Sequence, residues 1–358
     1  MLEKKHLPWL DLFRFFAAFE VLASHARGFV FVEYGALIDN QNILVSTFYA
    51  ITRMGSEAVI IFFVLSGFLV GGKAIERLSN GTFHNLDYII DRMLRILIPL
   101  FPALLLSVIC DFVVSKSINV IELFGNIFFL QGMLVKPLSG NAPLWSLSYE
   151  FWFYLLIFFV GGMLLSKAKK WVWLIGIVSV FVVFSVLNAA YLFCWVIGAI
   201  VYIYRNNEKN NLVFSLASLG IFLILFFIQI SLVSKSVDID FFSDYLPSLN
   251  ILYILLSMVF GIFLQQTILR IPKNSIVVKI NTIGAFLASF SYTLYLTHYP
   301  ILSLFKSLGF EKYNSITFKS MMVYMGFMAI CLLIAFVIYL PFEKRTDYYK
   351  KLIKKRYY

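Results

Sequence analysis

The chain has 358 residues, of which 61% are hydrophobic and 14% charged, and its formal net charge is +11. Apolar runs of about 18 or more residues recur along the whole length, which is typical of a polytopic helical membrane protein and excludes a soluble globular domain. The alternating pattern of a transmembrane β-barrel is absent.

The positive charge does not indicate a nucleic-acid partner, because of where it lies. Lys and Arg gather in short loops and in the C-terminal stretch KKLIKKRYY. The positive-inside rule and attraction to anionic lipid headgroups both account for that placement. We therefore expect membrane lipids, and no nucleic acid, among the partners.

The apolar runs predict an all-α transmembrane bundle of about ten spanning helices with both termini in the cytoplasm. The integral membrane domain is expected over residues 1–342, followed by a basic cytoplasmic tail over 343–358. The expected spans are about 8–30, 54–72, 94–114, 144–165, 171–187, 189–204, 212–233, 249–267, 283–305 and 320–342.

The segment 120–135 is apolar but ambiguous, since it is short and contains Glu122, Asn126 and Gln131. If it crossed the membrane, every later loop would change sides, and the basic tail would face outward. The positive-inside rule therefore favours a segment that lies against the outer face.

The first apolar segment, Pro8 to about Val32, carries ionisable residues where a simple anchor has none. Charge at bilayer depth costs at least ~2.5–3.5 kcal/mol per residue, so it marks a functional site by default. Arg14 and His25 have ten residues between them. This separation places both on one helix face, about 16 Å apart along the axis. The sequence therefore predicts a fixed cation and a titratable imidazole on one face of this helix.

Two glycines and two arginines mark the next helices. Gly67 and Gly71 in FFVLSGFLVGG have the spacing of closely packed helices. Arg92 and Arg95 lie at the cytoplasmic entrance of the third expected span. They either anchor the helix under the positive-inside rule or bind a phosphorylated cytoplasmic ligand, for which guanidinium forks are suited.

Glu150 lies in the stretch APLWSLSYEFWFYLL, together with Ser146 and Tyr149 on one helix face. Trp145 suits the membrane interface. Two roles for Glu150 stay open. It neutralises an arginine or histidine on a neighbouring helix, or it orients and charges the imidazole of His25.

His298 lies in SFSYTLYLTHYPIL, one turn after Tyr295. Pro300 removes a backbone hydrogen bond and tends to kink the helix, and Thr297 can help to satisfy the freed carbonyls. His298 either packs at this kink or takes part in acceptor binding.

Other chemical signals are missing from the sequence. It has no Walker-type loop, no HExxH or Cys/His metal cluster and no Gly-x-Ser-x-Gly elbow, so we expect no metal site. The three cysteines, Cys110, Cys194 and Cys331, lie inside apolar runs and are expected to be small core residues.

The stretches LDLFRFFAAFEVLASHA, FFVLSGFLVGG, APLWSLSYEFWFYLL and SFSYTLYLTHYPIL together resemble the acyltransferase-3 family of membrane O-acyltransferases. The spacing of Arg14 and His25 matches the first-helix motif of that family, and DRMLRILIP resembles its cytoplasmic arginine motif. Thr297 and Tyr299 depart from it, since many members have tryptophan at these positions. Some members have an additional SGNH-type domain, which we do not expect here.

The resemblance implies transfer of an acyl group, usually acetyl, from cytoplasmic acyl-CoA to a hydroxyl of a cell-surface or secreted carbohydrate or its lipid-linked precursor. His25 would deprotonate that hydroxyl with help from Glu150, and Arg14, Arg92 and Arg95 would hold the donor. Acyl-CoA (acetyl-CoA) is then a co-substrate, no cofactor is bound permanently, and the protein is multi-pass in the plasma (inner) membrane. Residues expected to line the acceptor pocket or to support it are Trp145, Ser146, Tyr149, Tyr295 and His298.

Several alternatives stay open at this point. Direct transfer and an acyl-histidine intermediate fit the sequence equally, as do a single copy and a homo-oligomer. A carrier or flippase for a glycan precursor would also use buried charges along a substrate path. A polyprenyl-phosphate-dependent glycosyltransferase is less favoured, because the 31–53 segment is short and holds only Glu33 and Asp39 as acidic residues.

Overall fold

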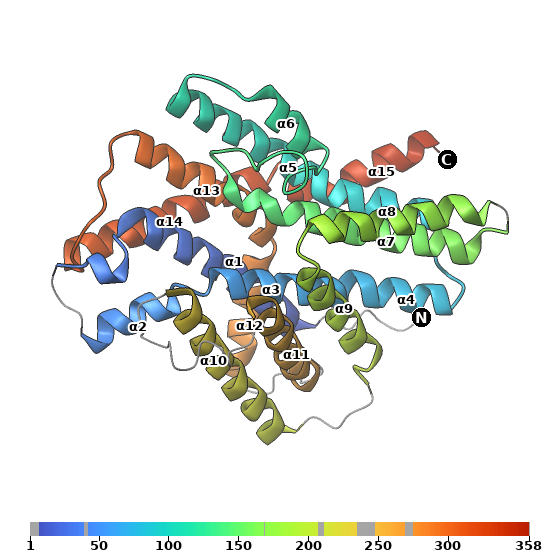
Figure 1. Ribbon diagram of the computed structural model, residues 1–358, viewed down its shortest axis with the longest axis horizontal. Coiled ribbons are helices and arrows are strands. Elements are labelled where there is room, and N and C mark those ends of the chain that lie inside the picture. The colour runs from blue at the N-terminus through green and yellow to red at the C-terminus, as the bar shows by residue number, and fades with distance from the viewer. Residues whose placement is uncertain are drawn as a thin grey trace. The chain divides into compact units, whose positions relative to one another are not determined.

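The computed structural model describes residues 7–38, 42–167, 169–206, 211–234, 248–268 and 275–357. Within these ranges the regular structure is helical (Figure 1), and β-pairing is limited to the isolated bridges Phe31–Tyr313 and Gln131–Val135. The all-α prediction is therefore confirmed for the described residues. Residues 1–6 and 358, which fall in the expected membrane domain and tail, lie outside them.

Helices make up most of the described residues. Their bounds are α1 Pro8–Val30, α2 Ile43–Ile51, α3 Gly55–Ser66, the π-helical turn η2 Gly67–Gly72, α4 Lys73–Ser79, α5 Asn85–Ser115, α6 Val120–Ile127, α7 Trp145–Leu165, α8 Lys170–Val186, α9 Ala190–Ile203, α10 Leu212–Ser234, α11 Leu249–Ile268, α12 Ser275–Ala288, α13 Ser291–Ser307, α14 Phe318–Tyr339 and α15 Thr346–Tyr357, with short 3₁₀ turns at Tyr34–Ala36, Ala142–Leu144 and Glu343–Arg345.

Six helical stretches of the described chain are long and apolar enough to cross a bilayer. A bent pair, Val277–Ala288 and Ser291–Ser307, gives a seventh if it counts as one span. Of the other expected spans, α8 and α9 are shorter apolar helices, and α1 carries four charged residues among its apolar ones. The number of ten and the cytoplasmic location of the termini stay predictions.

The 120–135 segment is not one continuous helix. Its helical part, α6, has 8 residues, which is about 12 Å of rise and far short of a bilayer. The chain then turns through positive φ angles of 58° at Phe129 and 85° at Gly132. This agrees with the prediction that the segment does not cross the membrane as a helix.

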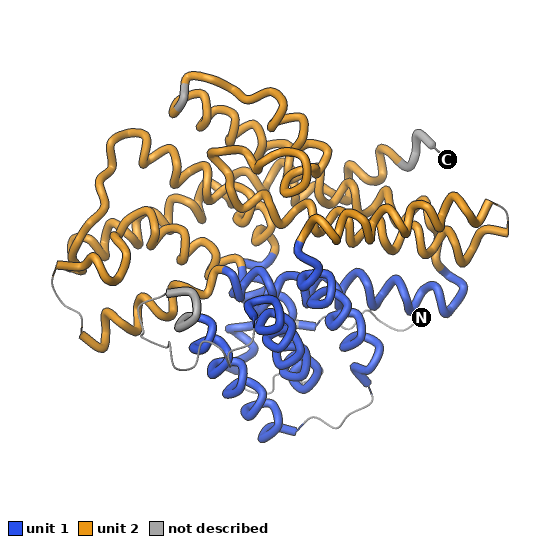
Figure 2. The backbone as a smooth tube through the Cα atoms, in the orientation of Figure 1, with its two compact units in different colours: residues 1–17, 56–82, 188–288 blue, residues 18–55, 83–187, 289–358 orange. Residues whose placement is uncertain are grey.

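The chain divides into two compact units, which are coloured separately in Figure 2. Unit 1 comprises residues 1–17, 56–82 and 188–288, and unit 2 comprises residues 18–55, 83–187 and 289–358.

Unit 1 is built on a very close approach of the Gly67–Gly72 turn to α9. A Cβ atom at Gly67 would lie 1.8 Å from the carbonyl oxygen of Trp195, and one at Gly198 would lie 2.0 Å from the carbonyl oxygen of Val64. A Cβ at Gly71 would lie 2.8 Å from the Trp195 ring. The two backbones touch where both lack side chains, which confirms the prediction of close packing from the glycine spacing.

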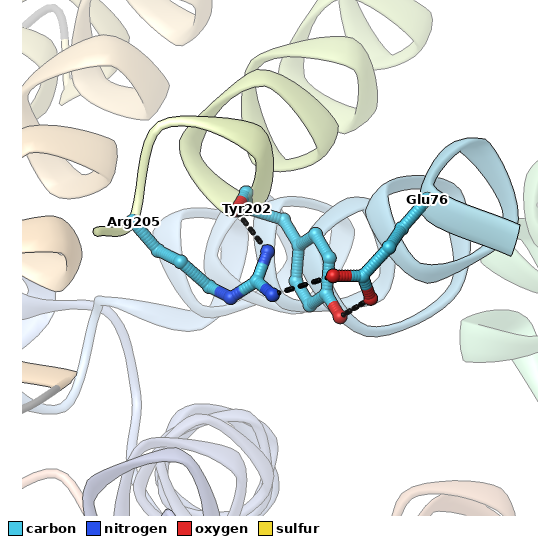
Figure 3. A network of polar contacts seen from close by, with 3 residues as sticks. All are labelled: Glu76, Tyr202 and Arg205. Atoms are coloured by element: carbon cyan, nitrogen blue, oxygen red, sulfur yellow. Dashed lines mark hydrogen bonds and ion pairs between the residues drawn. The ribbon is translucent and has the colours of Figure 1, made fainter. Parts of the chain in front are cut away.

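A polar network closes one end of this packing (Figure 3). Glu76 on α4 accepts hydrogen bonds from the Tyr202 hydroxyl at 2.5 Å and from Arg205 Nη2 at 2.7 Å. Arg205 also donates to the Tyr202 carbonyl at 2.7 Å, with its guanidinium 3.8 Å from the centre of the Tyr202 ring. Each of the three side chains therefore touches the other two, and the network holds the end of α9 to α4.

Unit 2 is centred on α13. This helix packs against α5 and α14, while α5 also contacts α7 and α15, and α7 contacts α8. Cys110 on α5 and Cys331 on α14 are fully buried, and their thiols approach the carbonyls of Pro300 and His298. Cys194 is likewise fully buried in unit 1. The expectation of small core cysteines is confirmed.

The close approach in unit 1 predicts that Gly67→Ala destabilises the protein by about 1–3 kcal/mol, since the new methyl meets a backbone carbonyl that cannot move without separating the helices. Gly220→Ala on α10 is the matched control, because a Cβ there meets no atom within 4 Å. Thermal unfolding in detergent should show a lower midpoint for Gly67→Ala and an unchanged or higher midpoint for Gly220→Ala. Equal midpoints would contradict this account of the packing.

Candidate functional site

Two histidines, 273 residues apart in the chain, meet inside unit 2. His25 Nδ1 on α1 lies 2.9 Å from His298 Nε2 on α13. The rings are nearly parallel, with centroids 5.1 Å apart. His298 is fully buried, whereas His25 is half-buried.

A backbone carbonyl determines which nitrogen of each ring carries a hydrogen. His298 Nδ1 lies 3.0 Å from the Leu294 carbonyl oxygen. Because a carbonyl can only accept, His298 Nδ1 must be the protonated nitrogen. Neutral His298 therefore presents an unprotonated Nε2, and His25 Nδ1 must donate to it. The chain of bonds leaves the lone pair of neutral His25 on Nε2.

Aromatic rings surround this pair. The Tyr299 ring stands edge-on to His25, with centroids 5.2 Å apart, and Phe29 packs against Tyr299 at 5.4 Å. The Tyr295 ring lies 6.0 Å from the His298 ring. The histidine pair is thus held among aromatic side chains from α1 and α13.

Asn141 supports the helix that carries His298. Pro300 has no N–H to donate to the Leu296 carbonyl, four residues earlier. The fully buried Asn141 Nδ2 supplies that bond at 2.9 Å and also donates to Ser107 Oγ at 3.0 Å. Helix α13 continues through Pro300 without a break. Thr297 bonds to the Thr293 carbonyl at 2.8 Å, so the expectation that it relieves the kink at Pro300 is corrected.

Ser146 and Tyr295 join the start of α7 to α13. Their hydroxyl oxygens lie 2.7 Å apart, and each also lies near the Pro143 carbonyl, at 3.2 Å for Ser146 and 3.0 Å for Tyr295. Trp145 packs edge-on against Tyr149 at 5.5 Å. These contacts give the Ser146 and Tyr295 hydroxyls partners within the protein, beside the histidine pair.

Glu150 accepts a hydrogen bond from the Tyr154 hydroxyl, one turn further along α7. The Arg92 guanidinium lies 5.9 Å from the centre of the Tyr154 ring. Glu150 and Arg95 both act electrostatically on the buried Tyr292 hydroxyl at the start of α13. Glu150 therefore shares its surroundings with the arginines, and its expected orientation of His25 stays a prediction.

The predicted site residues thus fall into three groups. His25 and His298 touch, and Tyr295 lies beside His298 and bonds to Ser146. Trp145 and Tyr149 pack against each other on α7. Arg92, Arg95 and Glu150 gather around Tyr154, still in unit 2. Arg14 belongs to unit 1, where its Nη1 lies 3.7 Å from Asp11 Oδ1.

Two supporting residues, Asn141 and Tyr154, were not identified from the sequence. Pro300 alone indicates an unpaired carbonyl at Leu296, but its donor lies 155 residues away. No local pattern marks Tyr154, which is one of many aromatic residues on α7.

Residues 7–340 match the family described as the Acyltransferase domain. The chain belongs to this family. It is also similar to Acyltransferase MdmB of Streptomyces mycarofaciens, with 30% identity over 152 residues. That match covers 42% of this chain and 38% of MdmB, so it spans well under half of either protein. No solved structure matches the chain.

The Asn141 bond leads to a rescue prediction. Asn141→Leu should destabilise the protein by about 1–3 kcal/mol, because the buried Leu296 carbonyl loses its donor. Adding Pro300→Ala restores a backbone N–H four residues after Leu296, so the double variant should regain much of the lost thermal stability. A double variant that melts at or below the Asn141→Leu midpoint would show that Asn141 does not serve this carbonyl.

Proposed function

We propose that the protein is a membrane O-acyltransferase in which His25 is the general base. It transfers an acyl group, most simply acetyl, from acyl-CoA to a hydroxyl of a cell-surface or secreted carbohydrate or its lipid-linked precursor. Family membership and the apolar helices support a membrane acyltransferase. The donor, the acceptor and the location in the plasma (inner) membrane are parts of the proposal.

The observation that carries the proposal is the hydrogen-bond chain from the Leu294 carbonyl through His298 to His25. It leaves a lone pair on Nε2 of the half-buried His25, which is what a general base requires. In the reaction, His25 Nε2 takes the proton of the acceptor hydroxyl. At the same time, the oxygen of that hydroxyl attacks the thioester carbonyl carbon. The C–S bond breaks, an ester forms, and the CoA thiolate takes the proton from the imidazolium.

His298 acts as a positioning residue for His25 in this scheme. Its Nε2 accepts the Nδ1–H of His25 both before and after His25 is protonated. A hydrogen bond to a charged group is worth about 1.5–3 kcal/mol, more than one between neutral groups. The bond therefore strengthens as the imidazolium forms, which favours the transition state over the ground state.

Arg92 and Arg95 suit the phosphate end of the acyl-CoA donor. Coenzyme A carries its phosphates and its thioester at opposite ends of the pantetheine arm. Tyr292, beside Arg95 and Glu150, lies six residues before His298 on α13, which is about 9 Å along the helix. Phosphates held by Arg92 and Arg95 would thus lie at a different level of unit 2 from a thioester at His25. Arg14 is proposed as a further donor-binding residue.

The test uses purified full-length protein in detergent, acetyl-CoA labelled in the acetyl group, and cell-envelope glycan as the acceptor. His25→Ala should lower the rate of label transfer by about 10²–10⁴-fold, since it removes a positioned base. His84→Ala is the matched control, because His84 is an exposed residue before α5. Thermal melting checks that each variant is folded.

Two outcomes would contradict the proposal. If the His25→Ala rate stays within a few-fold of the wild-type rate, the base is another group. If wild-type protein consumes no acetyl-CoA but moves the glycan precursor across liposome membranes, the protein is a carrier.

A further inference from the structure

The C-terminal helix α15 carries Lys350, which adds a third cation to Arg92 and Arg95. α15 packs against α5, which carries Arg92 and Arg95. Lys350 Nζ lies 4.0 Å from Asp91 Oδ1, next to Arg92 in the chain, and 3.8 Å from Asp347 on its own helix. Both arginines lie within electrostatic reach of the Lys350 ammonium group.

The segment before α15 is attached to the centre of unit 2. Glu343 Oε2 accepts the backbone N–H of Thr293 at 3.0 Å and its hydroxyl at 2.6 Å, at the N-terminus of α13. The Thr346 hydroxyl, at the start of α15, bonds to the Glu343 carbonyl at 2.7 Å. These bonds fix where α15 begins, so the position of Lys350 beside α5 is determined by the fold and not by an unattached tail.

The cations beside α15 suit an anionic ligand. Asp91 and Asp347 lie near Lys350, and Glu150 lies with the two arginines. Of these carboxylates, Asp347 is 92% exposed and therefore well screened by water. The contact between Lys350 and Asp91 is at the outer limit for an ion pair, while the Lys350 side chain is only 19% exposed. A phosphate placed here would meet three cations, and the two arginines among them offer forked donors suited to phosphate.

We propose that Lys350 joins Arg92 and Arg95 in binding a phosphate group of the acyl-CoA donor, so that α15 is part of the donor site. This inference rests on the proposed function. It assigns a binding role to the tail, which the sequence alone assigned to anchoring at anionic lipid. The phosphate is either the 3′-phosphate of the donor or its diphosphate, and the chemistry of recognition is the same for both.

The experiment compares Lys350→Gln with Lys351→Gln, each in full-length protein in neutral detergent. Lys351 is exposed and one position further along α15, so its replacement removes the same charge from another side of the helix. Steady-state kinetics are measured with acetyl-CoA and with acetyl-dephospho-CoA. Lys350→Gln should raise the KM for acetyl-CoA about tenfold with little change in kcat, while Lys351→Gln stays within twofold of wild type.

The comparison of acetyl-CoA with acetyl-dephospho-CoA shows which phosphate Lys350 contacts. If Lys350→Gln raises the KM for acetyl-CoA alone, Lys350 binds the 3′-phosphate. If it raises both KM values equally, Lys350 binds the diphosphate. Either result supports the proposal, and restoration of the wild-type KM by Lys350→Arg would strengthen it.

Three results would overturn it. Equal KM values for Lys350→Gln and wild type, with acetyl transfer intact, would remove Lys350 from the donor site and leave the proposed function standing. An effect of Lys350→Gln that appears only in liposomes containing anionic lipid would assign the residue to the bilayer surface. A wild-type protein that does not use acetyl-CoA would overturn the proposed function together with this inference.

Discussion

The hydrogen bond from His298 Nδ1 to the Leu294 carbonyl is the constraint on which the site depends. It fixes the tautomer of a fully buried imidazole, which fixes the direction of the bond to His25 and leaves the lone pair of His25 on Nε2. A carboxylate performs this orienting task in many hydrolases. Here a neutral imidazole can do so without placing a second full charge in the apolar interior, where an ion is costly.

Residues elsewhere in unit 2 hold α13, the helix that carries His298, in place. Pro300 would leave the Leu296 carbonyl without a donor only two residues before His298, and Asn141 supplies one. At the start of α13, Glu343 bonds to Thr293 and so links the helix to the C-terminal segment. The helix that carries His298 is thus held at its start and at its proline by polar groups from distant parts of the sequence. In unit 1, glycines bring the backbones of the Gly67–Gly72 turn and α9 into direct contact, and the Glu76–Tyr202–Arg205 network holds the end of α9 to α4.

Local sequence patterns predicted the features that depend on residues close together in the sequence. Hydropathy gave the helical class, and the spacing of Gly67 and Gly71 gave a close helix contact. His25 and His298 were both singled out, but their contact was not predicted, because residues 273 positions apart share no periodic pattern. Pro300 indicated a kink, yet the helix continues through it, since the missing bond is replaced by a side chain that no local rule could identify. Two roles were expected for Glu150, to neutralise a neighbouring arginine or histidine or to orient His25, and its hydrogen bond to Tyr154 was not predicted.

A double-mutant cycle on His25 and His298 tests the central claim most directly. Acyl-transfer rates are compared for wild type, His25→Ala, His298→Ala and the double variant, each checked for folding by thermal melting. If His298 acts only by orienting His25, the double variant should be no slower than His25→Ala alone, because residues that act as a unit give non-additive losses. Losses that multiply would mean that the two histidines act independently, and would contradict the account.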